Sequence, residues 1–193
     1  MPMHVEVASR APHPRKYGAT FAESWTCADG ATIVTVGAVL AGRDPIVVSD
    51  LLRAGARALV TSRNALATAL AGLDRVVGRH AREARDDRLA GAIVFFALEP
   101  NGAGVAVAGA GQLHAVALDG SGAARPIHGH AGALGTGIEP KDVVEHVQLR
   151  RDDLLVAATV PIDRAWWDSG LRTADALLHR SAQHEASAAV VSV

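Results

Sequence analysis

The histidines of this sequence are the first candidates for chemistry, because they could bind a metal. His128 and His130 stand two residues apart, which would place both on one side of an extended segment. No third ligand lies beside them in the sequence, and a metal site needs a defined number and geometry of ligands. We therefore interpret residues 128–132 as a solvated loop that carries a histidine pair.

Cys27 is the only cysteine, so the chain has neither a disulfide framework nor a four-cysteine zinc site. A nucleophilic cysteine needs an activating base and positive surroundings. Cys27 lies in a predicted strand before the turn residues Asp29 and Gly30, and we expect a structural thiol there. The sequence also lacks the G-x-S-x-G motif of a serine nucleophile.

Two groups of glycines resemble nucleotide-binding loops only in part. Gly109 and Gly111 follow a predicted strand, but a dinucleotide fingerprint also needs a third glycine and a following helix. The glycines at 129, 132, 135 and 137 lack the Gly-Lys-Ser/Thr of a P-loop, which favours a flexible loop.

The paired tryptophans Trp166 and Trp167 begin the last predicted helix. We expect one ring to pack in the core and the other to cover an edge. The alternative is a partner-binding anchor, because tryptophan is enriched at binding hot spots.

The composition indicates a folded protein without a strongly charged surface. Hydrophobic residues make up 49% of the chain, too many for a disordered chain, and the formal net charge is −1. This balance argues against a nucleic-acid-binding or membrane-surface protein. The apolar runs are too short to span a membrane, and the start lacks the apolar core of a signal peptide. We expect a single cytoplasmic domain over residues 1–193.

The elements that would position these side chains form an α+β pattern. The sequence predicts a strand at 3–9, a hairpin over 20–42 with its turn at Asp29-Gly30, and helices at 43–62 and 63–87. Asp44 would cap the first helix and Pro45 would begin it. Short strands follow over 89–160, then one helix at 163–184 and a strand at 187–193. This order favours a sandwich over a doubly wound parallel sheet.

Three segments resemble the metal-dependent PPM protein phosphatases, and most of all the SpoIIE type with its small RsbX-like members. Residues 105–122 resemble the family's "N-A-G-H" strand and hairpin, with Gln112 where histidine is usual. Residues 132–159 resemble its "LG…GD…TDG" segment, and residues 32–45 resemble its "GDvmGHG" strand and loop. The likeness spans nearly the whole chain. It implies an α-β-β-α sandwich, two packed antiparallel sheets flanked by helix pairs, and dephosphorylation of phosphoserine or phosphothreonine.

The resemblance also implies four carboxylate positions for two divalent cations, and two of these positions have lost their ligand. Glu23 and Glu185 occupy the first and the last position, as vestigial candidates. Ala38 stands where the bridging aspartate is expected, and Val160 where the aspartate of "TDG" is expected. Mg²⁺ and Mn²⁺ require several oxygen ligands, which two carboxylates cannot supply for two ions. We therefore expect no catalytic residue and no cofactor.

Three functional hypotheses follow. The first is a catalytically degenerate PPM-type domain, a pseudophosphatase, that acts as a binding or regulatory module for a bacterial stress-signalling protein or phosphoprotein. The second is an active Mn²⁺- or Mg²⁺-dependent phosphatase in which Asp44 or Asp163 replaces a lost ligand. The third is a structural subunit that keeps the fold for packing alone.

Overall fold

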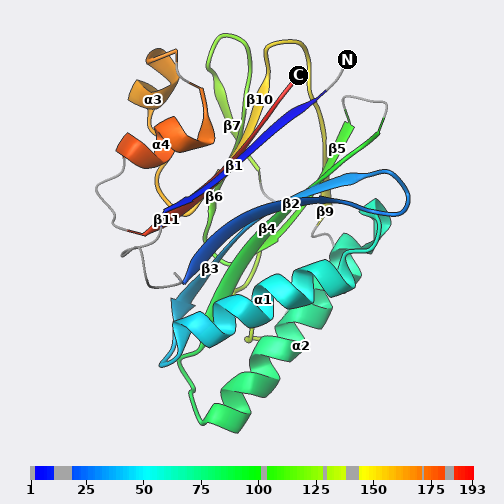
Figure 1. The fold of residues 1–193 in the computed structure, drawn as a ribbon, viewed down its shortest axis with the longest axis vertical. Helices are drawn as coiled ribbons and strands as arrows, with labels where there is room; N and C mark the ends of the chain where they lie inside the picture. The colour runs from blue at the N-terminus through cyan, green and yellow to red at the C-terminus, as the bar shows by residue number, and fades with distance from the viewer. Residues whose placement is uncertain are drawn as a thin grey trace.

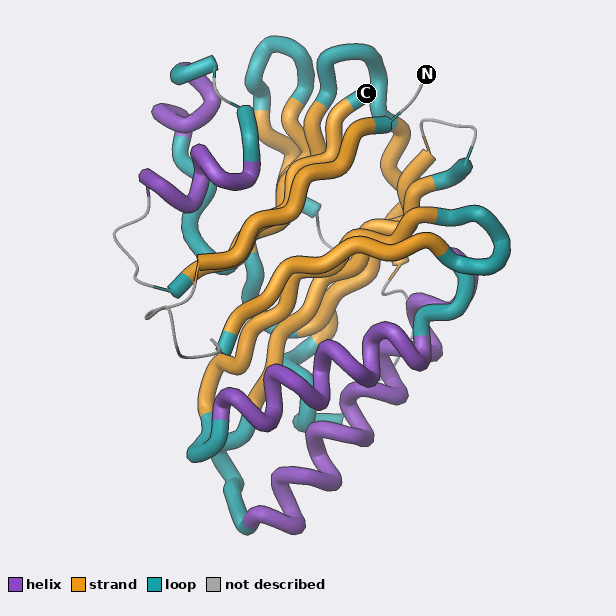
Figure 2. Tube along the Cα trace, viewed as in Figure 1, coloured by secondary structure: helices purple, strands orange, loops and turns teal. Residues whose placement is uncertain are grey.

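In the computed structural model, the chain forms two β-sheets packed face to face, with two helices on the outer face of each (Figure 1). The structure describes residues 3–10, 19–100, 104–127, 130–137, 144–170, 172–180 and 185–193. The layers can be followed along the chain trace in Figure 2. This arrangement confirms the predicted α-β-β-α sandwich.

The larger sheet has the strand order β2-β3-β4-β5-β8, and β9 also pairs with β5. Its pairings are antiparallel except that of β8 with β5, which is parallel. The strands of this sheet are β2 (Thr20–Thr26), β3 (Thr32–Ala41), β4 (Ala90–Leu98), β5 (Gly104–Ala110), β8 (His130–Ala131) and β9 (Val144–Gln148). Gly30 has a φ of 81° in the turn between β2 and β3, a conformation that glycine adopts without strain, so the predicted hairpin is confirmed.

The smaller sheet is antiparallel and has the strand order β1-β11-β10-β6-β7. β1, the first strand of the chain, is an edge strand of this sheet and pairs with β11, the last strand. The strands of this sheet are β1 (His4–Arg10), β6 (His114–Leu118), β7 (Ala124–Pro126), β10 (Leu154–Ala158) and β11 (Ala186–Ser192).

A helical hairpin covers the outer face of the larger sheet. It consists of α1 (Pro45–Leu59), a short 3-10 helix (Arg63–Ala65) and α2 (Leu66–Ala84). Asp44 occupies the N-cap position of α1 and Pro45 begins the helix, as predicted, but the Asp44 side chain makes no capping hydrogen bond. Asp44 therefore marks the start of α1, but its carboxylate does not bind the backbone N–H groups of the first turn.

The predicted last helix is in fact two short helices, α3 (Arg164–Asp168) and α4 (Ala174–Arg180), so the prediction of one continuous helix was wrong. Gly170 adopts a φ of 73°, a left-handed conformation that ends the first helix. The Thr173 hydroxyl accepts the Ala176 N–H at 3.1 Å and starts the second. Residues 181–184 of the predicted helix lie outside the described part of the chain.

Alternating side chains divide the interior into three apolar layers. One lies between the helical hairpin and the larger sheet, one between the two sheets, and one between the smaller sheet and α3 and α4. Trp166 and Trp167 both lie in the third layer, 0% and 7% exposed, so both rings are core residues. Within the described ranges, no helix is long and apolar enough to cross a membrane.

Candidate functional site

The two sheets meet at the end where β2 begins and β3 ends, and this is where Ala38 and Glu185 lie. Ala38 is paired with Thr20 in the register of β2 and β3, and its side chain lies in the layer between the sheets. The Thr20 N–H donates to Glu185 Oε1 at 2.8 Å, which ties the larger sheet to the residue before β11. The structure therefore brings Ala38 and Glu185 to the same end of the sandwich, with Thr20 between them.

A network of hydroxyl groups joins three strands, β1, β2 and β11, and the residue after β10 at this end. Ser187 is fully buried, and its Oγ lies 2.9 Å from the Ser9 Oγ and 2.9 Å from the Thr20 Oγ1. The Ser187 N–H donates to the Thr159 Oγ1 at 2.9 Å, and the Ser9 Oγ accepts the Ala22 N–H at 3.0 Å. Hydroxyls can donate and accept at once, so they satisfy one another without any charge.

Glu23 lies on the other face of the larger sheet and points toward α1. Phe21 and Trp25 share that face, because side chains alternate along a strand. Arg53 donates from Nη2 to Glu23 Oε1 at 2.6 Å, and Arg57 donates from Nε to Glu23 Oε2 at 2.8 Å. Burial raises the pKa of Glu23, but the hydrogen bonds and charges of Arg57 and Arg53 outweigh it and hold that pKa below its ordinary value.

Each arginine also lies over an aromatic ring of β2. The guanidinium carbon of Arg53 is 5.7 Å from the centre of the Phe21 ring, and that of Arg57 is 5.4 Å from the centre of the Trp25 ring. Such contacts are favourable because the ring face is electronegative. Glu23 is thus part of a joint between α1 and β2, and the sheet separates it from Ala38.

Val160 follows Thr159 directly, but its side chain packs on the opposite side of the smaller sheet. It is 1% exposed and lies in the layer that contains Trp166 and Trp167. Thr159 itself turns toward Ser187 and the hydroxyl network. The side chains of Ala38 and Val160 therefore occupy different layers of the sandwich.

The oxygen ligands at this end do not fit a pair of Mg²⁺ or Mn²⁺ ions. Glu185 is the one predicted ligand that lies beside Ala38, and two hard cations need several convergent carboxylates. Across the described residues, no group of three or more His, Cys, Asp or Glu side chains is close enough to hold a metal. No step of hydrolysis can be derived through metals from this set of ligands.

Asp163 and Asp44, the two aspartates considered as substitute metal ligands, differ in whether their side chains make a capping hydrogen bond. The Asp163 carboxylate accepts the Trp166 N–H at 2.7 Å and caps α3, so it already has a structural role. Asp44 is exposed and makes no capping hydrogen bond. Of these two side chains, Asp44 is the one that could turn to another partner.

The remaining candidates for chemistry were Cys27 and the pair His128 and His130. Cys27 packs against the layer beneath the helical hairpin, its Sγ lies 3.4 Å from the Val60 carbonyl, and burial followed by the nearby Asp29 charge raises its pKa. This environment disfavours the reactive thiolate. His128 lies outside the described residues, and His130 is described only as part of β8.

Sequence reasoning missed two buried aspartates. Asp86 is 5% exposed and accepts the Arg43 N–H at 2.6 Å, which fastens the loop after β3 to the loop after α2. Asp74 is 7% exposed and accepts the Gly135 N–H at 2.7 Å. The Arg43 and Gly135 N–H groups are 43 and 61 positions from these aspartates, so no local motif identifies the two contacts.

No protein-family model and no curated protein sequence matches the chain. Its structure is similar to that of a serine/threonine phosphatase of S. agalactiae, with a TM-score of 0.75, 12% identity and all of both chains covered. It is also similar to PppA of Pseudomonas aeruginosa, described as a key regulatory component of T6SS, with a TM-score of 0.74, 17% identity, and 98% of this chain and 97% of that chain covered.

A third similar structure contains the RsbU and RsbW domains of a Mycobacterium tuberculosis protein. The TM-score is 0.73 at 16% identity, over 98% of this chain and 59% of that one. At these identities the likeness establishes the fold. The chain has the fold of the bacterial PPM serine/threonine phosphatases, as its sequence motifs predicted.

Proposed function

From a fold shared with bacterial serine/threonine phosphatases, we propose that the chain is a catalytically degenerate member that binds a phosphorylated signalling protein without hydrolysing it. The proposal assigns the chain a regulatory role in bacterial phospho-signalling. One observation carries it: the set of ligands at the end of the sandwich where Ala38 lies.

Of the four carboxylate positions that the resemblance implies, one has its carboxylate beside Ala38 in the described part of the chain. Glu185 is the predicted ligand beside Ala38, and its Oε1 already accepts the Thr20 N–H. Glu23 is bound by Arg53 and Arg57 on the opposite face of the sheet. Two-metal hydrolysis depends on cations that activate water and stabilise the phosphoryl charge, and these side chains cannot hold such a pair.

The similar structures support a regulatory role by analogy. One is described as a key regulatory component, one contains RsbU and RsbW domains, and another comes from work on the bacterial stressosome. A fold alone does not determine function, so the role must be tested on this chain.

Arg43 is the side chain best placed to recognise a phosphate. It follows β3, the strand that carries Ala38, and it is exposed. Among the residues that the structure describes, its guanidinium has no ion-pair partner, whereas Arg53, Arg57 and Arg63 are all paired. An arginine with free N–H groups suits bidentate binding of a phosphate.

The test is to probe an array of serine- and threonine-phosphorylated peptides, with unphosphorylated copies, in the presence of Mn²⁺. We expect retention on phosphorylated peptides, no release of phosphate, and weaker retention of Arg43→Gln. Arg151→Gln is the matched control. Arg151 is an exposed arginine in the turn before β10, at the end of that strand away from Thr159 and the hydroxyl network. Equal retention of both peptide forms, or none, would overturn the proposed partner.

The active-enzyme alternative keeps one supporting observation, the Asp44 carboxylate that makes no capping bond. In the same assay, this alternative predicts Mn²⁺-dependent release of phosphate that is lost in both Asp44→Asn and Glu185→Gln. That outcome would replace a degenerate module with a phosphatase that has rearranged ligands.

A further inference from the structure

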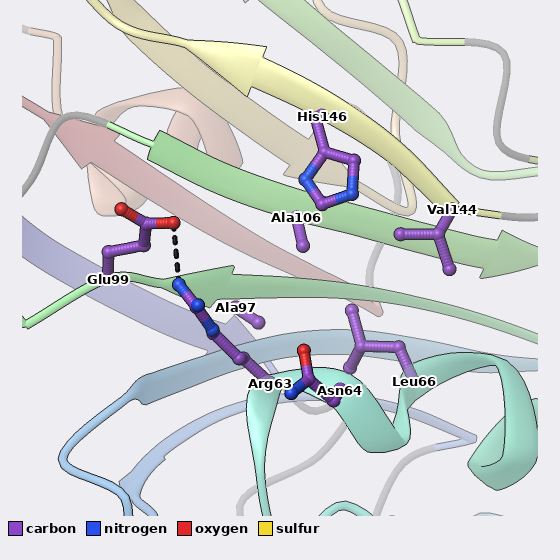
Figure 3. A pocket seen from close by; sticks show the side chains of 8 residues that line it. All are labelled: Arg63, Asn64, Leu66, Ala97, Glu99, Ala106, Val144 and His146. Carbon is purple, nitrogen blue, oxygen red and sulfur yellow. Dashed lines mark hydrogen bonds and ion pairs between the residues drawn. The ribbon is translucent and has the colours of Figure 1, made fainter.

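A small cavity opens on the outer face of the larger sheet, at the end remote from Ala38 and Glu185. It has a volume of about 320 Å³ and lies where α2 begins (Figure 3). Arg63, Asn64 and Leu66 line it from the helical side. The cavity is at the lower end of the size range of small-molecule sites, so it suits a small ligand.

The floor of the cavity is a row of short side chains across three strands. Ala97 of β4 is paired with Ala106 of β5, and Ala106 is paired with His146 of β9. In the next row on the same face, two residues further along each strand, Phe95 and Val144 flank Ala108, so larger groups fill that part of the sheet. The two alanines therefore leave a hollow between the sheet and the start of the helical hairpin, in which Ala106 is 8% exposed.

An ion pair borders this hollow. The Arg63 guanidinium donates from Nη1 to Glu99 Oε1 at 2.6 Å, and the two side chains are 45% and 44% exposed. A pair this exposed contributes little to stability, so both charges can rearrange toward a ligand at low cost. Figure 3 shows the pair on one side of the cavity, with His146 and Asn64 on other sides.

Gly104 leaves room for the Glu99 carboxylate. A β-carbon at residue 104 would lie 3.0 Å from the Glu99 carboxyl carbon and 3.1 Å from its Oε2. The Glu99 N–H also donates to the Gly104 carbonyl at 3.2 Å. The carboxylate thus rests against bare backbone at the border of the cavity.

We propose that this cavity binds a free apolar α-amino acid. The ligand's carboxylate would meet Arg63 and the Asn64 amide, its ammonium group would meet Glu99, and its side chain would lie against Ala106 and Val144, above the buried Ala97 and Leu66. An adjacent positive and negative charge complement a zwitterion, whereas a simple carboxylate would be repelled by Glu99 and a simple amine by Arg63. This site lies on a different face from Ala38 and Glu185 and does not depend on the proposed function.

The test is calorimetric titration of the whole chain with six L-amino acids, namely alanine, valine, leucine, isoleucine, methionine and phenylalanine. We expect saturable binding of at least one. For that ligand, the analogue without the amino group and the analogue without the carboxylate should each bind at least tenfold more weakly. Analogues that bind as well as the amino acid, or six amino acids that show no binding at millimolar concentration, would overturn the proposal.

Variants then locate the ligand. Arg63→Gln and Glu99→Gln should each weaken binding at least tenfold, and Ala106→Leu should abolish it by filling the hollow while it keeps both charges. Glu83→Gln is the matched control, because Glu83 belongs to an exposed pair with Arg79 elsewhere on α2. Circular dichroism would check that each variant is folded. Binding that survives both charge variants would place the ligand elsewhere and contradict the assignment.

Discussion

Thr20 and Glu185 are joined by a hydrogen bond of 2.8 Å, although 165 positions separate them in the sequence. The bond links β2 of the larger sheet to the residue before β11 of the smaller sheet. It lies beside Ala38, where the family resemblance places a bridging aspartate. At the position where the resemblance implies a bridging aspartate, the sheets are joined by neutral hydroxyls and by a hydrogen bond from the Thr20 amide to the Glu185 carboxylate.

We expect Ser187→Ala to destabilise the fold by about 1–3 kcal/mol, because it leaves the Ser9 and Thr20 hydroxyls without their shared partner. Chemical denaturation would measure the loss. Ser24→Ala, an exposed serine on β2, should change stability by less than about 0.5 kcal/mol. Equal effects of the two variants would show that the hydroxyl network does not hold the sheets together.

The ion pairs of Glu23 should contribute stability that depends on pH. Because its pKa is lowered in the folded state, the contribution is present above the ordinary glutamate pKa and is lost as the pH falls through the folded-state value. Glu23→Gln does not titrate, so it should be less stable than wild type by about 1 kcal/mol near neutrality. The difference should shrink between about pH 5 and pH 3.

Denaturation curves at several pH values would test this, with Glu83→Gln as the control in an exposed pair. If the difference between wild type and Glu23→Gln stays constant over that range, the charge of Glu23 does not support the joint between α1 and β2.

Two aspartate substitutions should respond differently to Mn²⁺. Val160→Asp buries a charge beside Trp166, and we expect a loss of several kcal/mol that Mn²⁺ does not reverse. Ala38→Asp places a carboxylate near Thr20 and Glu185, and Mn²⁺ should raise its melting temperature. Binding to the folded state alone contributes about 2.7 kcal/mol at a hundredfold excess over Kd.

Thermal melts with and without Mn²⁺ would compare the two variants with wild type. A metal-dependent rise for Val160→Asp but not for Ala38→Asp would mean that residue 160, and not residue 38, faces the former site.

The sequence predicted the fold well because its signals are local. Asp29-Gly30 between two alternating runs indicated the hairpin, and Asp44-Pro45 indicated the start of α1. The break at Gly170 was missed, because a glycine within a helical pattern does not by itself reveal a left-handed conformation.

It was harder to predict toward which face of its sheet the side chain at each implied ligand position points, since a shift of one residue in a strand moves a side chain to the other face. The alternation of Phe21, Glu23 and Trp25 was the signal that Glu23 shares a face with two aromatic rings. Leu154, Val156, Ala158 and Val160 all lie in one layer, so the alternation of β10, continued two residues past its end, was the signal that Val160 faces away from Ala38. The network around Ser187 joins residues up to 178 positions apart, which no local pattern can indicate.

The most direct test of the central claim is calorimetric titration of the wild-type chain with Mn²⁺ at neutral pH. Because Ala38 and Val160 stand at two of the four ligand positions that the resemblance implies, and Glu23 is bound to Arg53 and Arg57, we predict no saturable binding in the micromolar range. Two micromolar Mn²⁺ sites would contradict the account and indicate a phosphatase centre built from other ligands.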